Sequence, residues 1–99
     1  GQQGNYPRVI DYGMQALKKL PEDSEYIADA HIALMVAHST LKRFDLALDH
    51  GWRGYDVAKH DIERRASLIA NLSATALRMG RFRAARRGFI ATLNLTELD

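Results

Sequence analysis

One local pattern occurs three times in this chain at equal intervals. An aromatic residue stands two positions after a break-like residue and is followed three positions later by a small or short apolar one; the aromatic residues are Tyr6, Phe44 and Phe82, each 38 residues from the next. Self-similarity at a fixed period of about 20–50 residues is typical of a repeated supersecondary unit. The chain is therefore expected to stack equivalent units, since one unit cannot bury its apolar face alone.

Proline usage indicates that these units are helical. Pro7 and Pro21 are the only two prolines of the 99 residues, so nothing after Pro21 breaks a helix with comparable strength. Alternating Val, Ile and Thr runs typical of strands are missing, whereas Ala and Leu recur at spacings of three and four. We predict an all-α fold.

About five helices are expected from the apolar spacing and from the residues that start and stop helices. Asp23 or Ser24 is a candidate N-cap for the second helix, Asp61 for the fourth, and Gly80 suits the left-handed residue that ends a helix. The expected helices cover roughly residues 7–20, 24–43, 44–60, 61–79 and 82–93.

The third unit resembles a tetratricopeptide (TPR) repeat. Its large–Leu–small order, Gly-x-aromatic turn and Ala-x-x-x-Phe segment are carried by Ile69, Leu72, Ser73, Ala76, Gly80, Phe82, Ala85 and Phe89. The first unit matches the second half of the pattern with Gly4, Tyr6, Gly13, Ala16 and Pro21. The middle unit matches at His31, Leu34, Phe44 and Ala47, with Lys42 in place of the turn glycine. The period exceeds the family's usual 34 residues or so by about one helical turn.

The resemblance implies an α-solenoid of antiparallel helix pairs, similar to the longer-period units of bacterial regulatory proteins. Residues 1–22 would be the second helix of a truncated repeat, and residues 23–60 and 61–99 would be repeats. We expect a fragment of a larger cytoplasmic protein, acting as a non-catalytic protein–protein interaction scaffold or regulatory module. The leading helices of such an array line its groove, which here implies Asp29, Ile32, Val36, Ser39, Thr40, Ser67, Ala70, Asn71, Ala74 and Arg78.

Little in the sequence indicates catalysis, a cofactor or a metal. The chain has no cysteine and no phosphate-binding, zinc-protease or nucleophile-elbow motif. His31 and His38 share a helix side but are separated by about 10 Å of helical rise, too far for one zinc ion. His50 and His60 are expected at the surface or between helices, and Gly51 with Gly54 at a close helix contact. No apolar run is long enough to span a membrane.

The positive charge is local and supports an alternative function. Seven arginines and no acidic residue lie between positions 64 and 87, at Arg64, Arg65, Arg78, Arg81, Arg83, Arg86 and Arg87. Such a stretch can be a solvated helix face or can bind an anionic ligand or nucleic acid. Single-stranded nucleic acid requires exposed aromatic residues between the cations. Because Phe82 and Phe89 are expected on the core stripe, the pattern argues against a nucleic-acid partner.

Two predictions concern the ends of the chain. Phe82, Ala85 and Phe89 should be buried while Arg83, Arg86 and Arg87 stay exposed, because the two sets occupy different helix faces. The first helix carries an apolar stripe at Tyr6, Ile10, Met14 and Leu17. This stripe predicts a homo-oligomer formed through the first helix, or else a helix that folds back onto the second one.

Overall fold

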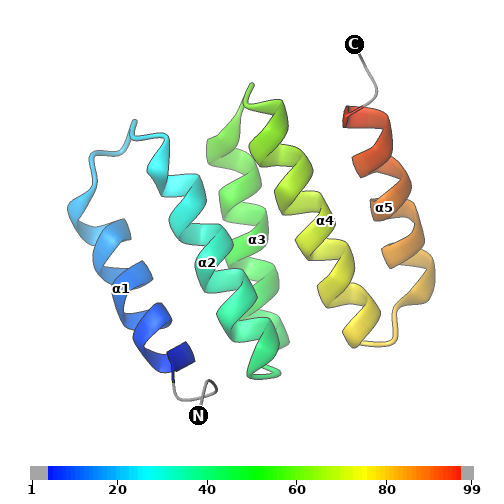
Figure 1. Cartoon of the computed structure of the whole chain (residues 1–99), viewed down its shortest axis with the longest axis horizontal. Helices are drawn as coiled ribbons and strands as arrows, with labels where there is room; N and C mark the ends of the chain where they lie inside the picture. Colours follow the sequence, from blue (N-terminus) through cyan, green and yellow to red (C-terminus); the bar gives the residue numbers. More distant parts are fainter. Residues whose placement is uncertain (1–4, 97–99) are drawn as a thin grey trace.

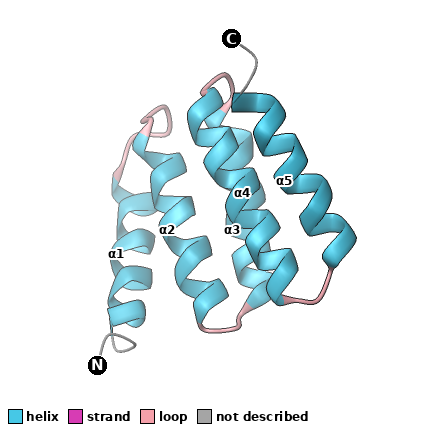
Figure 2. Ribbon diagram, turned by 45° about the vertical axis from the view of Figure 1, so that its right-hand side comes forward, coloured by secondary structure: helices cyan, strands magenta, loops and turns pink. Residues whose placement is uncertain are grey.

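The computed structural model describes residues 5–96, and their regular structure is entirely helical. The five helices in this part of the chain are α1 (Tyr6–Lys19), α2 (Tyr26–Thr40), α3 (Phe44–Ala58), α4 (Ile62–Arg78) and α5 (Phe82–Thr96). They lie side by side, with α1 and α5 at opposite ends (Figure 1). Each helix packs against the next one in the chain, and α2 also contacts α4. Figure 2 shows the short connections between them. The all-α prediction is confirmed.

The connections α2–α3 and α4–α5 are equivalent turns 38 residues apart. Lys42 and Gly80 both have left-handed backbone, with φ of 62° and 79°. The next residue in each turn, Arg43 or Arg81, donates its backbone N–H to the carbonyl of His38 or Ala76, and both bonds are 2.8 Å long. This is the helix-ending bond that a left-handed residue makes possible. The sequence period therefore corresponds to a structural period, even though lysine replaces glycine in one turn.

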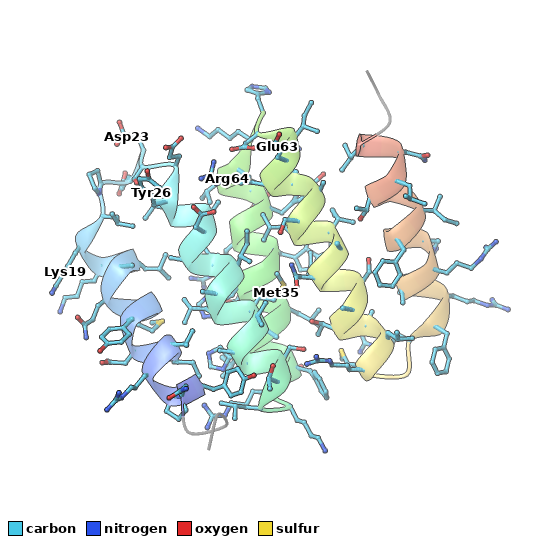
Figure 3. The ribbon with its side chains drawn as sticks, in the orientation of Figure 1. Lys19, Asp23, Tyr26, Met35, Glu63 and Arg64 are labelled. Atoms are coloured by element: carbon cyan, nitrogen blue, oxygen red, sulfur yellow. The ribbon has the colours of Figure 1, made fainter. Side chains whose placement is uncertain are left out.

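The core lies between α2, α3 and α4. Leu34, Met35 and Leu68 have no exposed surface, and Figure 3 shows Met35 near the centre of the row. Gly54 lets α3 approach its neighbours closely, because a Cβ atom there would lie 2.9 Å from the Cβ of His31 and 2.8 Å from Leu68 Cδ2. The close helix contact predicted for the glycines of α3 is confirmed.

The burial predicted for two aromatic residues of α5 is wrong. Phe82 is 67% exposed and Phe89 is 39% exposed, although Ala85 is buried at 2%. The reason is that, within residues 5–96, α5 packs only on α4. Ala85 faces α4, while the two phenylalanines point to a side that no described element covers. The prediction that Arg83, Arg86 and Arg87 are exposed is confirmed.

At the other end, α1 packs on α2 through a glycine. Gly13 is buried against Leu34, and a Cβ at this position would lie 2.8 Å from Leu34 Cγ. This contact leaves Tyr6, Ile10 and Leu17 half-buried and Met14 49% exposed. Helix α1 thus folds back onto α2, which is the second of the two predicted arrangements. Self-association through α1 stays a prediction. Gly4 and Glu97 lie outside the described residues.

No helix in the described part of the chain combines the length and the apolar character required to cross a bilayer.

Candidate functional site

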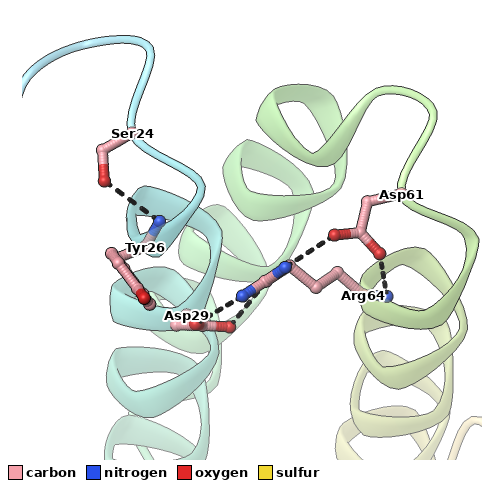
Figure 4. Close-up of polar contacts among 5 residues, drawn as sticks. All are labelled: Ser24, Tyr26, Asp29, Asp61 and Arg64. Atoms are coloured by element: carbon pink, nitrogen blue, oxygen red, sulfur yellow. Dashed lines mark hydrogen bonds and ion pairs between the residues drawn. The ribbon is translucent and has the colours of Figure 1, made fainter.

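The two leading helices, α2 and α4, form one face of the molecule, and arginine contacts tie them together at both ends. At the end where the helices begin, Arg64 binds Asp29 of α2 with two hydrogen bonds, from Nε at 2.9 Å and from Nη2 at 3.0 Å. Its third contact, from Nη1 to Asp61 Oδ2, is 2.7 Å long. Figure 4 shows the guanidinium between the two carboxylates.

Asp61 has two roles in this cluster. It is the N-cap of α4, where its side chain accepts the backbone N–H of Arg64 at 3.0 Å, as the sequence predicted. Hydrogen bonds donated by the side chain and backbone of Arg64 lower the pKa of Asp61, and the side-chain hydrogen bonds that Arg64 donates to Asp29 and Asp61 raise the pKa of Arg64. These charge-assisted hydrogen bonds keep the starts of α2 and α4 in register.

At the opposite end of the face, a hydroxyl of α2 meets two polar side chains of α4. Ser39 Oγ accepts a hydrogen bond from Arg78 Nη1 at 3.2 Å and lies 3.2 Å from Thr75 Oγ1. Ser39 and Thr75 are buried at 5% and 2% exposure, whereas Arg78 is exposed. The buried hydroxyls thus position the guanidinium of Arg78 at the rim of the face, where it can pair with an anionic group.

Five of the ten residues predicted for the groove line one shallow depression of about 40 Å³ at this end, namely Val36, Ser39, Asn71, Ala74 and Arg78. Of these, Ser39 belongs to the wall and not to the accessible surface, because its hydroxyl is buried. Val36 is 40% exposed and supplies an apolar contact beside Arg78.

The other five predicted groove residues lie elsewhere along α2 and α4. Asp29 is occupied by Arg64, Thr40 donates its hydroxyl to the Val36 carbonyl at 2.9 Å, and Ile32 packs against the core. Ser67 is exposed and Ala70 is half-buried. These contacts reduce the surface available to a partner to a strip along α4 with Val36 of α2.

The predicted basic patch divides into two groups. Three of its arginines make contacts within the chain: Arg64 in the carboxylate cluster, Arg78 at Ser39, and Arg65 with its guanidinium carbon 4.2 Å from the Tyr55 ring centroid. The remaining four are exposed and form no ion pair within residues 5–96: Arg81, Arg83, Arg86 and Arg87. The unpaired positive charge therefore belongs to the turn before α5 and to its first half.

Three histidines come together between α2 and α3, an arrangement that the sequence analysis did not find. His31 Nδ1 lies 3.1 Å from His50 Nδ1, and the His50 ring stacks on His38 with centroids 5.7 Å apart. All three side chains are buried at 5–7% exposure. His31 and His38 are two helical turns apart on one side of α2, so a residue of the facing helix can fit between them. The seven-residue spacing of His31 and His38 was the feature of the sequence that could have indicated this cluster.

Burial lowers the pKa of all three histidines. For His31 burial, and next the neighbouring His50, lower the pKa to about 4; burial is also the main cause for His38 and His50. The 3.1 Å contact requires one ring to donate and the other to accept, which suits two neutral rings. In the described residues, no group of three or more His, Asp or Glu side chains has the geometry to hold a metal ion. His60 is exposed, as predicted.

A separate hollow of about 230 Å³ lies where α3, α4 and α5 meet. Its lining is mostly apolar and includes Trp52, Ile69 and Met79, with Arg81 and Ser73 as its polar members. The Ser73 hydroxyl donates its hydrogen bond to the Ile69 carbonyl at 2.7 Å, so its proton already has an acceptor within the chain. The hollow thus suits an apolar group more than a reaction that needs converging acids and bases.

Comparisons of the chain with known protein families, with curated proteins and with solved structures find no match.

Proposed function

We propose that this chain is a TPR-like α-solenoid segment that acts as a non-catalytic protein-binding scaffold, with the α2–α4 face as its peptide site. The observation that carries this proposal is that α2 and α4 form one face whose two ends are tied by Arg64 and Arg78. A face whose backbone is held in place loses little conformational freedom when a peptide binds. Val36, Ser67 and Arg78 supply an apolar contact, a hydroxyl and a cation to such a peptide.

The alternative function is binding of an anionic ligand or nucleic acid through residues 64–87, and it has less support. Arg64 and Arg65 already contact groups of the chain itself and Arg78 belongs to the α2–α4 face, so the seven arginines do not form one continuous free patch. Phe82 and Phe89, which the case against nucleic acid placed in the core, are nevertheless both exposed.

Selection from a random peptide library tests the scaffold proposal. We expect the chain to enrich peptides that shift the backbone amide NMR signals of α2 and α4. Arg78→Glu should weaken these peptides roughly tenfold or more, because it places like charge where an anionic group would pair. Arg8→Glu, an exposed change on α1, is the matched control and should leave affinity unchanged.

Two results would count against the scaffold proposal. One is a library that yields no peptide above background. The other is a set of binders that shift only signals outside α2 and α4 and tolerate Arg78→Glu.

A further inference from the structure

The outward side of α5 is an apolar surface with a shallow hollow of about 380 Å³. Its lining, which we term the α5 outer face, consists of Leu77 from α4 and Phe82, Ala85, Arg86, Phe89, Ile90 and Leu93 from α5. Phe82 is 67% exposed, Leu77 48% and Ile90 43%. Large apolar side chains gathered in this way mark an interaction surface more often than scattered single ones do.

The charge around this face has one sign. Arg86 lies within the apolar lining, and Arg83 and Arg87 follow the adjacent row of the helix that leads to Ile90. All three are exposed and form no ion pair among the described residues. The sequence has no Asp or Glu from position 64 to position 96. Arg83 lies in the first turn of α5, where a cation opposes the helix dipole, so helix stability does not account for it.

We propose that the α5 outer face binds an amphipathic helix of a partner protein whose apolar stripe is flanked by Asp and Glu. Apolar side chains of the partner would cover Leu77, Phe82 and Ile90, in the helix-in-groove mode of recognition. Its carboxylates would pair with Arg83, Arg86 and Arg87, which a planar guanidinium does with two parallel hydrogen bonds. This surface is separate from the α2–α4 face and does not depend on the function proposed for it.

A helix fits this surface better than a nucleic-acid strand does. Phe82 and Phe89, which are both exposed near arginines, could each stack on a base. However, Leu77 and Ile90 are aliphatic and offer no ring for stacking, so a phosphodiester strand would leave them in contact with water. An apolar helix stripe covers aliphatic and aromatic side chains alike, which accounts for the whole lining.

Fluorescence anisotropy with two designed peptides tests this proposal. The first probe is a labelled helix of about 18 residues, five turns long, with leucines along one face and glutamates beside them. The second has lysine in place of each glutamate. We expect the glutamate peptide to bind at least tenfold more tightly, with affinity that falls when salt rises from about 50 to 300 mM.

The variants locate the binding. The double change Arg83→Glu with Arg87→Glu should weaken the glutamate peptide at least tenfold, and Phe82→Ser should weaken it severalfold. Both alter exposed side chains, so circular dichroism should show unchanged helix content. The double change Arg8→Glu with Lys18→Glu on α1 alters the net charge by the same amount at exposed positions and should have no effect.

Three outcomes would overturn the proposal. The glutamate and lysine peptides could bind equally, which removes the role of charge. A single-stranded DNA of about 12 thymidines could bind more tightly than the glutamate peptide, which assigns the face to nucleic acid. Sedimentation could instead show self-association that the double arginine variant abolishes, which assigns the face to a second copy of the chain.

Discussion

Truncation of Leu68 to alanine is expected to lower the free energy of unfolding by about 2–5 kcal/mol. Leu68 has no exposed surface and belongs to the core cluster with Met35 and Leu72. It also packs on Gly54, so its loss opens a cavity where α3 and α4 meet. A domain of this size has a total stability of roughly 5–15 kcal/mol, so the loss is a large share. Urea denaturation followed by circular dichroism measures it.

Phe82→Ala is the matched comparison for this prediction. Phenylalanine is the larger side chain, yet at 67% exposure its truncation should cost less than about 1 kcal/mol. A loss as large as that of Leu68→Ala would contradict the fold, since it would require that the α5 outer face is covered in the isolated chain.

The second large effect is expected from pH, through the buried histidines. The pKa of His31 is lowered to about 4 in the folded chain from an ordinary value of 6.5. Between these values the unfolded chain binds more protons, so stability falls as pH falls from 6.5 towards 4. His31 alone accounts for about 2–3 kcal/mol of this loss, at 1.36 kcal/mol per pH unit. His38 and His50, whose pKa values are also lowered by burial, add to it.

Charged groups around the three histidines also shift their pKa values. Asp49 favours protonation of His31 and His50, Arg53 disfavours it, and Arg43 disfavours protonation of His38. Burial outweighs them all, which fixes the sign of the dependence.

Urea titrations at several pH values between 7 and 4.5 measure the slope. His31→Asn should flatten it, because asparagine has no proton to gain, whereas His60→Gln at the exposed histidine should leave it unchanged. An equal slope in the wild-type chain and in His31→Asn would show that the cluster does not control acid stability.

The positions of the helices could be predicted from the sequence alone, because local interactions determine where a helix begins and ends. The cap at Asp61 and the left-handed Gly80 act within a few residues of the chain, and both lie where predicted. The absence of proline after Pro21 leaves the later helices unbroken. The 38-residue period also predicted that Lys42 would occupy a turn position, and it adopts the left-handed conformation found at Gly80. These features require no knowledge of distant neighbours.

Tertiary structure alone decided what each helix face meets. Periodicity places Phe82 and Phe89 on an apolar side of α5, but burial depends on whether another element lies there, and none of those described does. The pairing of Arg64 with Asp29, 35 residues away, and the contact of His50 with His31 depend on how α2, α3 and α4 are rotated about their axes. The sequence of a single helix does not contain that rotation, because it results from the packing of all neighbouring side chains together.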